Sequence, residues 1–140
     1  MRLRRCKADS LLLIGDRSDE SGRYEVYVTS FPDRKGKWSV SVKGGVHPRW
    51  RGDEIFYVDV EGNALMAVKV DTRSGRTELP RTLFTGEQVR ARLYNPPTDW
   101  QTLYDVAPDG ERFVVVQPVG EGTTATITVV QNWVREFKKQ

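Results

Sequence analysis

Few residues of this chain are of the types that perform chemistry, and they are widely separated. The single histidine, His47, follows two glycines at the start of a strand-like stretch, and the single cysteine, Cys6, lies about forty residues earlier. Zinc sites need several His or Cys ligands at short, regular spacings, so this pair predicts no metal site. We expect His47 to be structural or solvated, with ligand binding as the alternative.

The motifs of common enzyme active sites are also absent from the sequence. No Gly-x-Ser-x-Gly turn occurs, and Gly120-Glu121-Gly122 lacks the third glycine and the helix of a dinucleotide site. Asp16, Asp19 and Glu20 lie together in a polar turn, but calcium requires more oxygen ligands at fixed spacing. We therefore predict no catalytic residues, no metal and no cofactor.

The stretch 90–100 is the best candidate for a binding loop. It combines arginines with aromatic residues, the types enriched at interaction hot spots, and includes Arg92, Tyr94 and Trp100. Loops on a rigid scaffold often carry function. The alternative is that Leu93, Tyr94 and Trp100 only pack the loop against the body of the protein.

The composition predicts one globular domain with no targeting segment. The chain has 140 residues, of which 38% are hydrophobic and 29% charged. The first seven residues carry +4 and the last six carry +2 of a total of +3, which leaves −3 on the body. Nucleic acid is therefore not an expected partner. The one cysteine allows no internal disulfide, and the apolar run 11–14 is too short for a signal peptide or a membrane span.

Short strand-like runs separated by turn residues indicate an all-β chain. They contain alternating or continuous apolar residues and are rich in β-branched and aromatic types. The stretch 38–42 alternates, whereas 55–58 is apolar on both faces. These runs lie at 11–15, 24–29, 38–42, 55–58, 64–70, 82–84, 103–106, 113–116 and 127–130.

The strands form an imperfect repeat. Residues 48–58 align with 104–116, and a more degenerate copy lies at 5–14; each contains a short strand, an aspartate-containing turn and an apolar strand. The turn residues are Asp9, Asp53 and Asp109, and the loop 86–99 lengthens the second interval. A period in the low forties with four strands per unit is typical of β-propellers.

Some of these segments resemble a known family. The turn Ala107-Pro108-Asp109-Gly110 resembles the Ser-Pro-Asp-Gly turn of the TolB-type, WD40-like β-propellers. The runs 22–28 and 127–133 resemble blades of propellers attached to bacterial serine/threonine protein kinases. The similarity covers about 10–133, although the first two turns lack the proline and the glycine. It implies a sensing or scaffolding part with an extracytoplasmic, periplasmic location.

We accordingly predict about three four-stranded β-propeller blades, half of a six-bladed propeller, at about 2–43, 44–86 and 101–134. Such an incomplete ring leaves two apolar faces and an unpaired edge at 126–130, which favours a homodimer that completes the propeller. The predicted function is non-catalytic protein–protein interaction or self-assembly, without membrane insertion. Two alternatives are a propeller fragment of a larger peptidase- or kinase-linked enzyme, and a channel near His47 and Arg49 that binds a small ligand or cation.

Overall fold

The computed structural model describes residues 2–5, 11–17, 22–61, 63–94, 101–119 and 124–130. All regular secondary structure in these ranges is β-strand, which confirms the prediction of an all-β chain. Within the same ranges no helix is long and apolar enough to cross a membrane.

Eleven strands form three antiparallel sheets. The first sheet has the order β1 (Arg2–Arg5), β2 (Leu11–Arg17), β3 (Tyr24–Ser30) and β4 (Lys37–Ser39). The second has the order β5 (Val46–Arg51), β6 (Glu54–Asp59), β7 (Ala64–Lys69) and β8 (Arg81–Thr85). The third consists of β9 (Tyr104–Val106), β10 (Phe113–Val119) and β11 (Thr124–Val130), with β10 in the middle and β11 at the edge.

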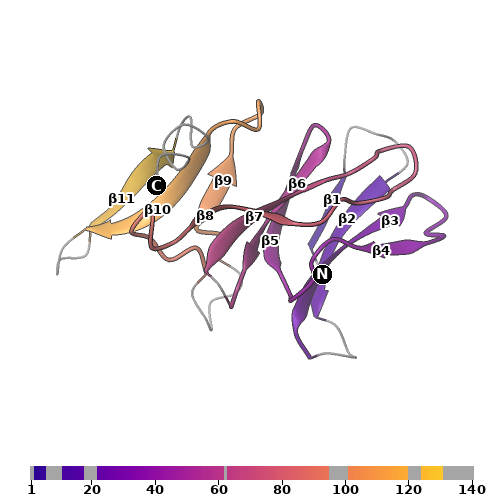
Figure 1. The fold of residues 1–140 in the computed structure, drawn as a ribbon, viewed down its shortest axis with the longest axis horizontal. Helices are drawn as coiled ribbons and strands as arrows, with labels where there is room; N and C mark the ends of the chain where they lie inside the picture. The colour runs from indigo at the N-terminus through magenta and orange to yellow at the C-terminus, as the bar shows by residue number, and fades with distance from the viewer. Residues whose placement is uncertain are drawn as a thin grey trace.

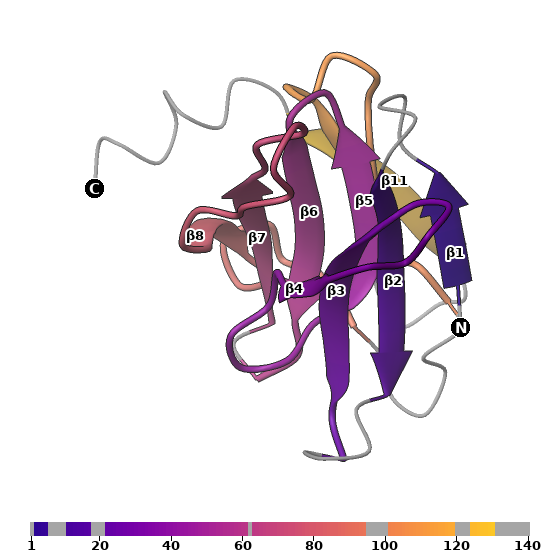
Figure 2. The ribbon, with the colours of Figure 1, turned by 90° about the vertical axis from the view of Figure 1, so that its right-hand side faces the viewer.

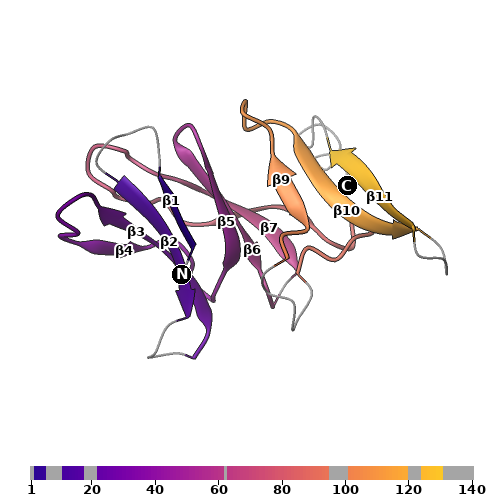
Figure 3. The same cartoon turned by 180° about the vertical axis from the view of Figure 1, so that it is seen from behind.

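The three sheets follow one another in chain order, with the β5–β8 sheet in the middle (Figures 1 and 3). Figure 2 looks along this row from the side of the β1–β4 sheet, behind which the β5–β8 sheet lies. The middle sheet is covered on both faces, and the four consecutive residues Ile55, Phe56, Tyr57 and Val58 of β6 are all buried. The burial of both faces of β6 explains why the sequence 55–58 is apolar at every position.

Two separate hydrophobic cores fill the two junctions between sheets. Ile55 and Tyr57 pack against Leu11, Leu13 and other residues of the first sheet. Phe56 lies in the second core, where its ring and that of Phe84 both contact the ring of Phe113 edge-on, at centroid distances of 5.3 and 5.6 Å. Alternate residues of β6 thus face opposite junctions, as the two-residue period of a strand requires.

The outermost strand of the first sheet differs from its prediction. The alternation of 38–42 predicts one strand with Trp38, Val40 and Val42 on a single face, but β4 ends at Ser39 and Val42 is exposed. The amides of Val40 and Ser41 both donate to the carbonyl of Val26, which breaks the ladder. Ser41 is then drawn inward, because its hydroxyl accepts from the Val26 amide at 2.9 Å.

The turn before β10 contains the aspartate that the repeat singled out. Its backbone closes where the Gly110 amide donates to the Ala107 carbonyl at 2.9 Å, with Gly110 at φ 74°. The carboxylate of Asp109 accepts from the amide of Glu111 and from Nε of Arg112, both at 2.9 Å. The first of these hydrogen bonds is the main reason why the pKa of Asp109 is lowered from its ordinary value.

Candidate functional site

An irregularity in β5 shapes the junction between the second and third sheets. The pairing of β5 with β6 shifts register between Val46 and Arg49, and His47 has a positive φ of 54°. A bulge of this kind re-aims side chains and leaves part of the ladder unpaired, and bulges often lie beside functional sites. The result is that His47 is buried, with Nδ1 3.4 Å from the hydroxyl of Thr102 and its ring 6.1 Å from that of Tyr94.

The hydroxyl of Tyr104 compensates for the disrupted ladder. It donates to the carbonyl of His47 at 2.6 Å and lies 3.2 Å from the carbonyl of Phe56. Buried carbonyls need hydrogen-bond donors, so this side chain ties β9 to the bulge of the neighbouring sheet. The guanidinium carbon of Arg49 lies 5.8 Å from the centroid of the same ring, within the range of a cation–π contact.

Two arginines of β5 share one carboxylate of β9. Nε of Arg49 donates to Oδ1 of Asp105 at 3.1 Å, and Nη2 of Arg51 lies 3.6 Å from the same atom. The side chain of Arg49 is only 8% exposed, whereas that of Asp105 is 62% exposed. Arg51 also donates through Nε to the carbonyl of Val106 at 3.1 Å. The junction therefore holds two guanidiniums against one carboxylate.

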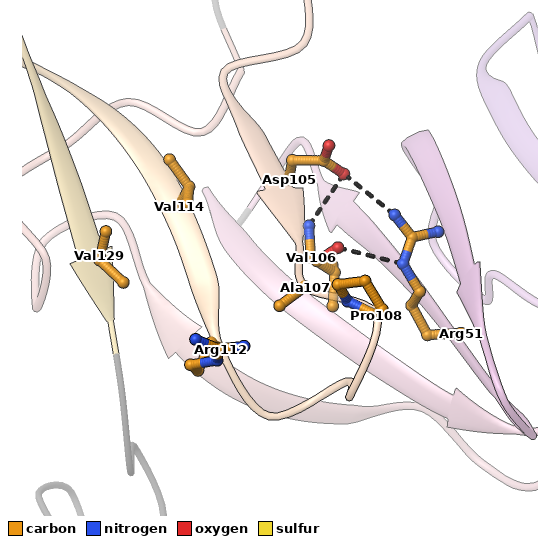
Figure 4. Close-up of a pocket in the computed structure, with 8 residues that line it drawn as sticks. All are labelled: Arg51, Asp105, Val106, Ala107, Pro108, Arg112, Val114 and Val129. Atoms are coloured by element: carbon orange, nitrogen blue, oxygen red, sulfur yellow. Dashed lines mark hydrogen bonds and ion pairs between the residues drawn. The ribbon is translucent and has the colours of Figure 1, made fainter.

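A groove of about 510 Å³ begins at this ion pair and continues over the outer face of the third sheet (Figure 4). Arg51 and Asp105 lie at one side and Arg112 at another, and the remaining lining is apolar. The apolar lining comprises Val106, Ala107, Pro108, Val114 and Val129. Such a surface offers contact area together with a few charged groups that can orient a bound partner or ligand.

The structure brings three of the five predicted site residues together. His47, Arg49 and Tyr94 lie at the same junction. Arg92 is exposed on the loop surface, and Trp100 lies outside the described residues. The structure therefore gathers His47 and Arg49 at a junction of two sheets, with Arg49 engaged in an ion pair.

The loop that carries Tyr94 is packed against the second sheet. Leu93 is fully buried and Tyr94 packs against the same core, as one of the two interpretations of the loop predicted. Asn63 fixes the loop: its Oδ1 accepts from the Leu93 amide at 2.9 Å, and its carbonyl accepts from the Gly86 amide at 2.7 Å. Tyr94 therefore contributes to packing, and Trp100 lies outside the described residues.

Sequence reasoning missed Arg51, Thr102, Tyr104 and Asp105 as members of the site. The alignment of the repeat contained a signal for one of them, because it places Asp105 at the position of Arg49. Residues of opposite charge at equivalent positions of neighbouring repeats can form an ion pair between them. No sequence signal pointed to Tyr104, whose role depends on the bulge.

A second buried polar cluster lies between the first two sheets. The hydroxyl of Ser41 lies 2.5 Å from Oε2 of the buried Glu25, and Tyr57 is buried nearby. Burial, reinforced by the charges of Asp59 and Glu25, raises the pKa of Tyr57 well above its ordinary value. This cluster joins a serine to a carboxylate without a histidine between them, so it does not have the geometry of a nucleophile activated by a base.

Metal-binding geometry is not found in the described ranges, where no group of three or more His, Cys, Asp or Glu residues is placed to hold an ion. Cys6, Asp19 and Glu20 lie outside those ranges. Comparison of the sequence with models of known protein families gives no match, and comparison with curated proteins gives none either. The resemblance to TolB-type propellers therefore stays a prediction.

Proposed function

We propose that this protein is a non-catalytic, propeller-like assembly module in which the two end sheets pair with a second copy of the chain. One observation carries the proposal. Apolar residues that face a neighbouring sheet are buried, whereas the equivalent residues on the outer faces of the first and third sheets are partly exposed. This difference is seen in the alternate residues of β2, β6 and β10, each of which lies between two other strands of its sheet.

One set of alternate residues faces the next sheet in chain order. In β2 this set includes Leu13, which packs against the second sheet, and in β6 it includes Phe56, which packs against the third. Both side chains are almost fully buried. The corresponding set of β10 includes Val114, which is only half-buried, and its cross-strand neighbour Val129 is 50% exposed. The outer face of the third sheet thus has the apolar character of a covered face.

The opposite set faces the preceding sheet. Tyr57 of β6 and Val115 of β10 are buried against the first and second sheets respectively. In the first sheet this set includes Ile14 and its cross-strand neighbour Tyr27, and both are half-buried. Tyr27 is partly covered by Lys37, whose Nζ lies 3.7 Å from the ring centroid.

Two copies joined head to tail would cover both of these faces at once. The outer face of the third sheet of each copy would pack against the outer face of the first sheet of the other, giving a closed ring of six sheets with two-fold symmetry. The two interfaces together would bury about 2,000 Å² or more, in the range of permanent homodimers. The resemblance to TolB-type propellers and the edge position of β11 are consistent with this arrangement.

The mass of the chain in solution tests the proposal. Light scattering behind a sizing column is expected to give about twice the 16.0 kDa of one chain. Val129→Glu, which places a charge on the apolar outer face of the third sheet, is expected to give the monomer mass. Leu79→Glu is the matched control, because Leu79 is 86% exposed and belongs to neither outer face.

If the wild-type protein is monomeric, no second copy covers these faces and the proposal is wrong. A dimer that tolerates Val129→Glu as well as Leu79→Glu would place the interface elsewhere and would also refute the ring. Circular dichroism of each variant establishes that the sheets are still folded, so that a loss of dimer is separated from a loss of structure.

A further inference from the structure

The first strands of the three sheets in chain order, β1, β5 and β9 (the inner strands), together carry an excess of positive charge. Arg49 and Arg51 of β5 lie side by side at the junction with β9, where Asp105 is, within the described part of the chain, the one carboxylate in ion-pair distance of either guanidinium. Arg49 is nine-tenths buried. A buried charge is costly unless it is paired, so one shared carboxylate leaves this junction short of an anion.

The hydrogen bonds of the two arginines leave donors for a ligand. Nε and Nη1 of Arg49 donate to Asp105 and to the Pro48 carbonyl, and Nε and Nη1 of Arg51 donate to the carbonyls of Val106 and Trp50. A guanidinium has five N–H groups in a planar fork, so further N–H groups remain on each. The carbonyl contacts hold both forks in place, which prepares them for an oxyanion.

The neighbouring inner strand repeats the basic character. Arg4 of β1 pairs with Leu13, and Arg49 of β5 pairs with Phe56; these are the residues of β2 and β6 that face the next sheet. Arg4 and Arg49 therefore hold equivalent register positions on successive inner strands. The third such position, opposite Val114, is held by Asp105. Of these three equivalent positions, two carry a positive charge (Arg4 and Arg49) and one carries a negative charge (Asp105).

We propose that Arg49 and Arg51 form a binding site for a small organic oxyanion, a carboxylate or phosphate group attached to an apolar body. The oxyanion would bind at the two guanidiniums beside Asp105, and the apolar body would lie in the adjoining end of the groove, over Ala107 and Pro108. Asp105 acts as the internal anion with which the ligand competes. The site is formed by β5, β9 and the residues directly after β9, and it does not use Val129, the residue whose substitution tests the proposed dimer.

Calorimetric titration with phenyl phosphate and with phenylacetate, at constant ionic strength, tests the site and separates the two sources of the oxyanion. Tighter binding of phenyl phosphate assigns a phosphate ligand, and tighter binding of phenylacetate assigns a carboxylate. Arg51→Gln is expected to weaken the preferred probe by about tenfold, because it removes a charged donor. Asp105→Asn is expected to tighten it severalfold, because the competing carboxylate is lost.

Arg73→Gln, at an exposed turn, is the matched control and is expected to leave the affinity unchanged. If Arg51→Gln does not fold, Asp105→Asn decides the question, since a purely structural ion pair gives no gain of affinity when its carboxylate is neutralised. Failure of both probes to bind the wild type, or equal affinities in wild type and Asp105→Asn, would overturn the proposal. Neither result bears on the mass of the assembly, so the two proposals fail separately.

Discussion

Removal of one hydroxyl, in the variant Tyr104→Phe, tests the account of the bulge in β5. The substitution keeps the ring and its packing but deletes the donor to the carbonyls of His47 and Phe56, which lie at 2.6 and 3.2 Å. Leaving a buried acceptor unpaired costs about 1–3 kcal/mol. The His47 carbonyl loses the shorter hydrogen bond, while the longer contact to Phe56 contributes less. We therefore expect the free energy of unfolding to fall by about 1–2 kcal/mol, at the lower part of that range.

Urea denaturation followed by fluorescence measures this change. With a slope of about 2 kcal/mol/M, the midpoint is expected to fall by roughly 0.5–1 M. Protein concentration must be the same for every variant, because association stabilises a dimer by mass action. Tyr94→Phe is the control, since Tyr94 lies at the same junction but is only half-buried, and its change should stay within about 0.5 kcal/mol. Equal midpoints for Tyr104→Phe and the wild type would refute the claim that this hydroxyl compensates for the bulge.

Three further predictions concern packing, the loop and pH. Phe113→Ala removes a fully buried ring that two other phenyl rings contact and should cost about 3–5 kcal/mol by the same denaturation assay. In Gly86→Ala the new Cβ would lie 2.0 Å from Nδ2 of Asn63 and 2.3 Å from the Ala91 carbonyl. The loop should therefore detach, which faster tryptic cleavage at the exposed Arg90 and Arg92 would reveal. The pKa of Tyr57 is raised above its ordinary value of 10.0 in the folded state. The stability that the neutral phenol contributes to the folded state is therefore fully present below pH 10 and is lost as the pH rises further. Stability should fall above pH 10 in the wild type and less steeply in Tyr57→Phe.

The candidate site was predictable only in part. His47 was singled out by its position at the start of a strand and Arg49 as part of a channel beside it, and both belong to the junction that the structure defines. Their partners Tyr104 and Asp105 come from a strand more than fifty residues later. Long-range neighbours of this kind are set by sheet packing and leave no local pattern in the sequence. The loop illustrates the same limit, because Arg92 and Leu93 are adjacent in sequence yet only Leu93 is buried.

The sequence by itself determined the class of structure. Two-residue periodicity, β-branched and aromatic residues and regularly spaced turns left no stretch with the periodicity of a helix, and the doubly apolar run at 55–58 identified a strand covered on both faces. These properties are local, since each depends on the conformational preference of a few neighbouring residues.

Tertiary structure alone decided the bulge at His47, the inward turn of Ser41 that ends β4, and the sharing of Asp105 by two arginines. Each of these departs from a regular strand because a partner from another strand supplies a hydrogen bond or a charge. Such a partner is brought close only when the sheets pack. The geometry of the site therefore follows from contacts between sheets, whereas the sheets themselves follow from the order of residues along the chain.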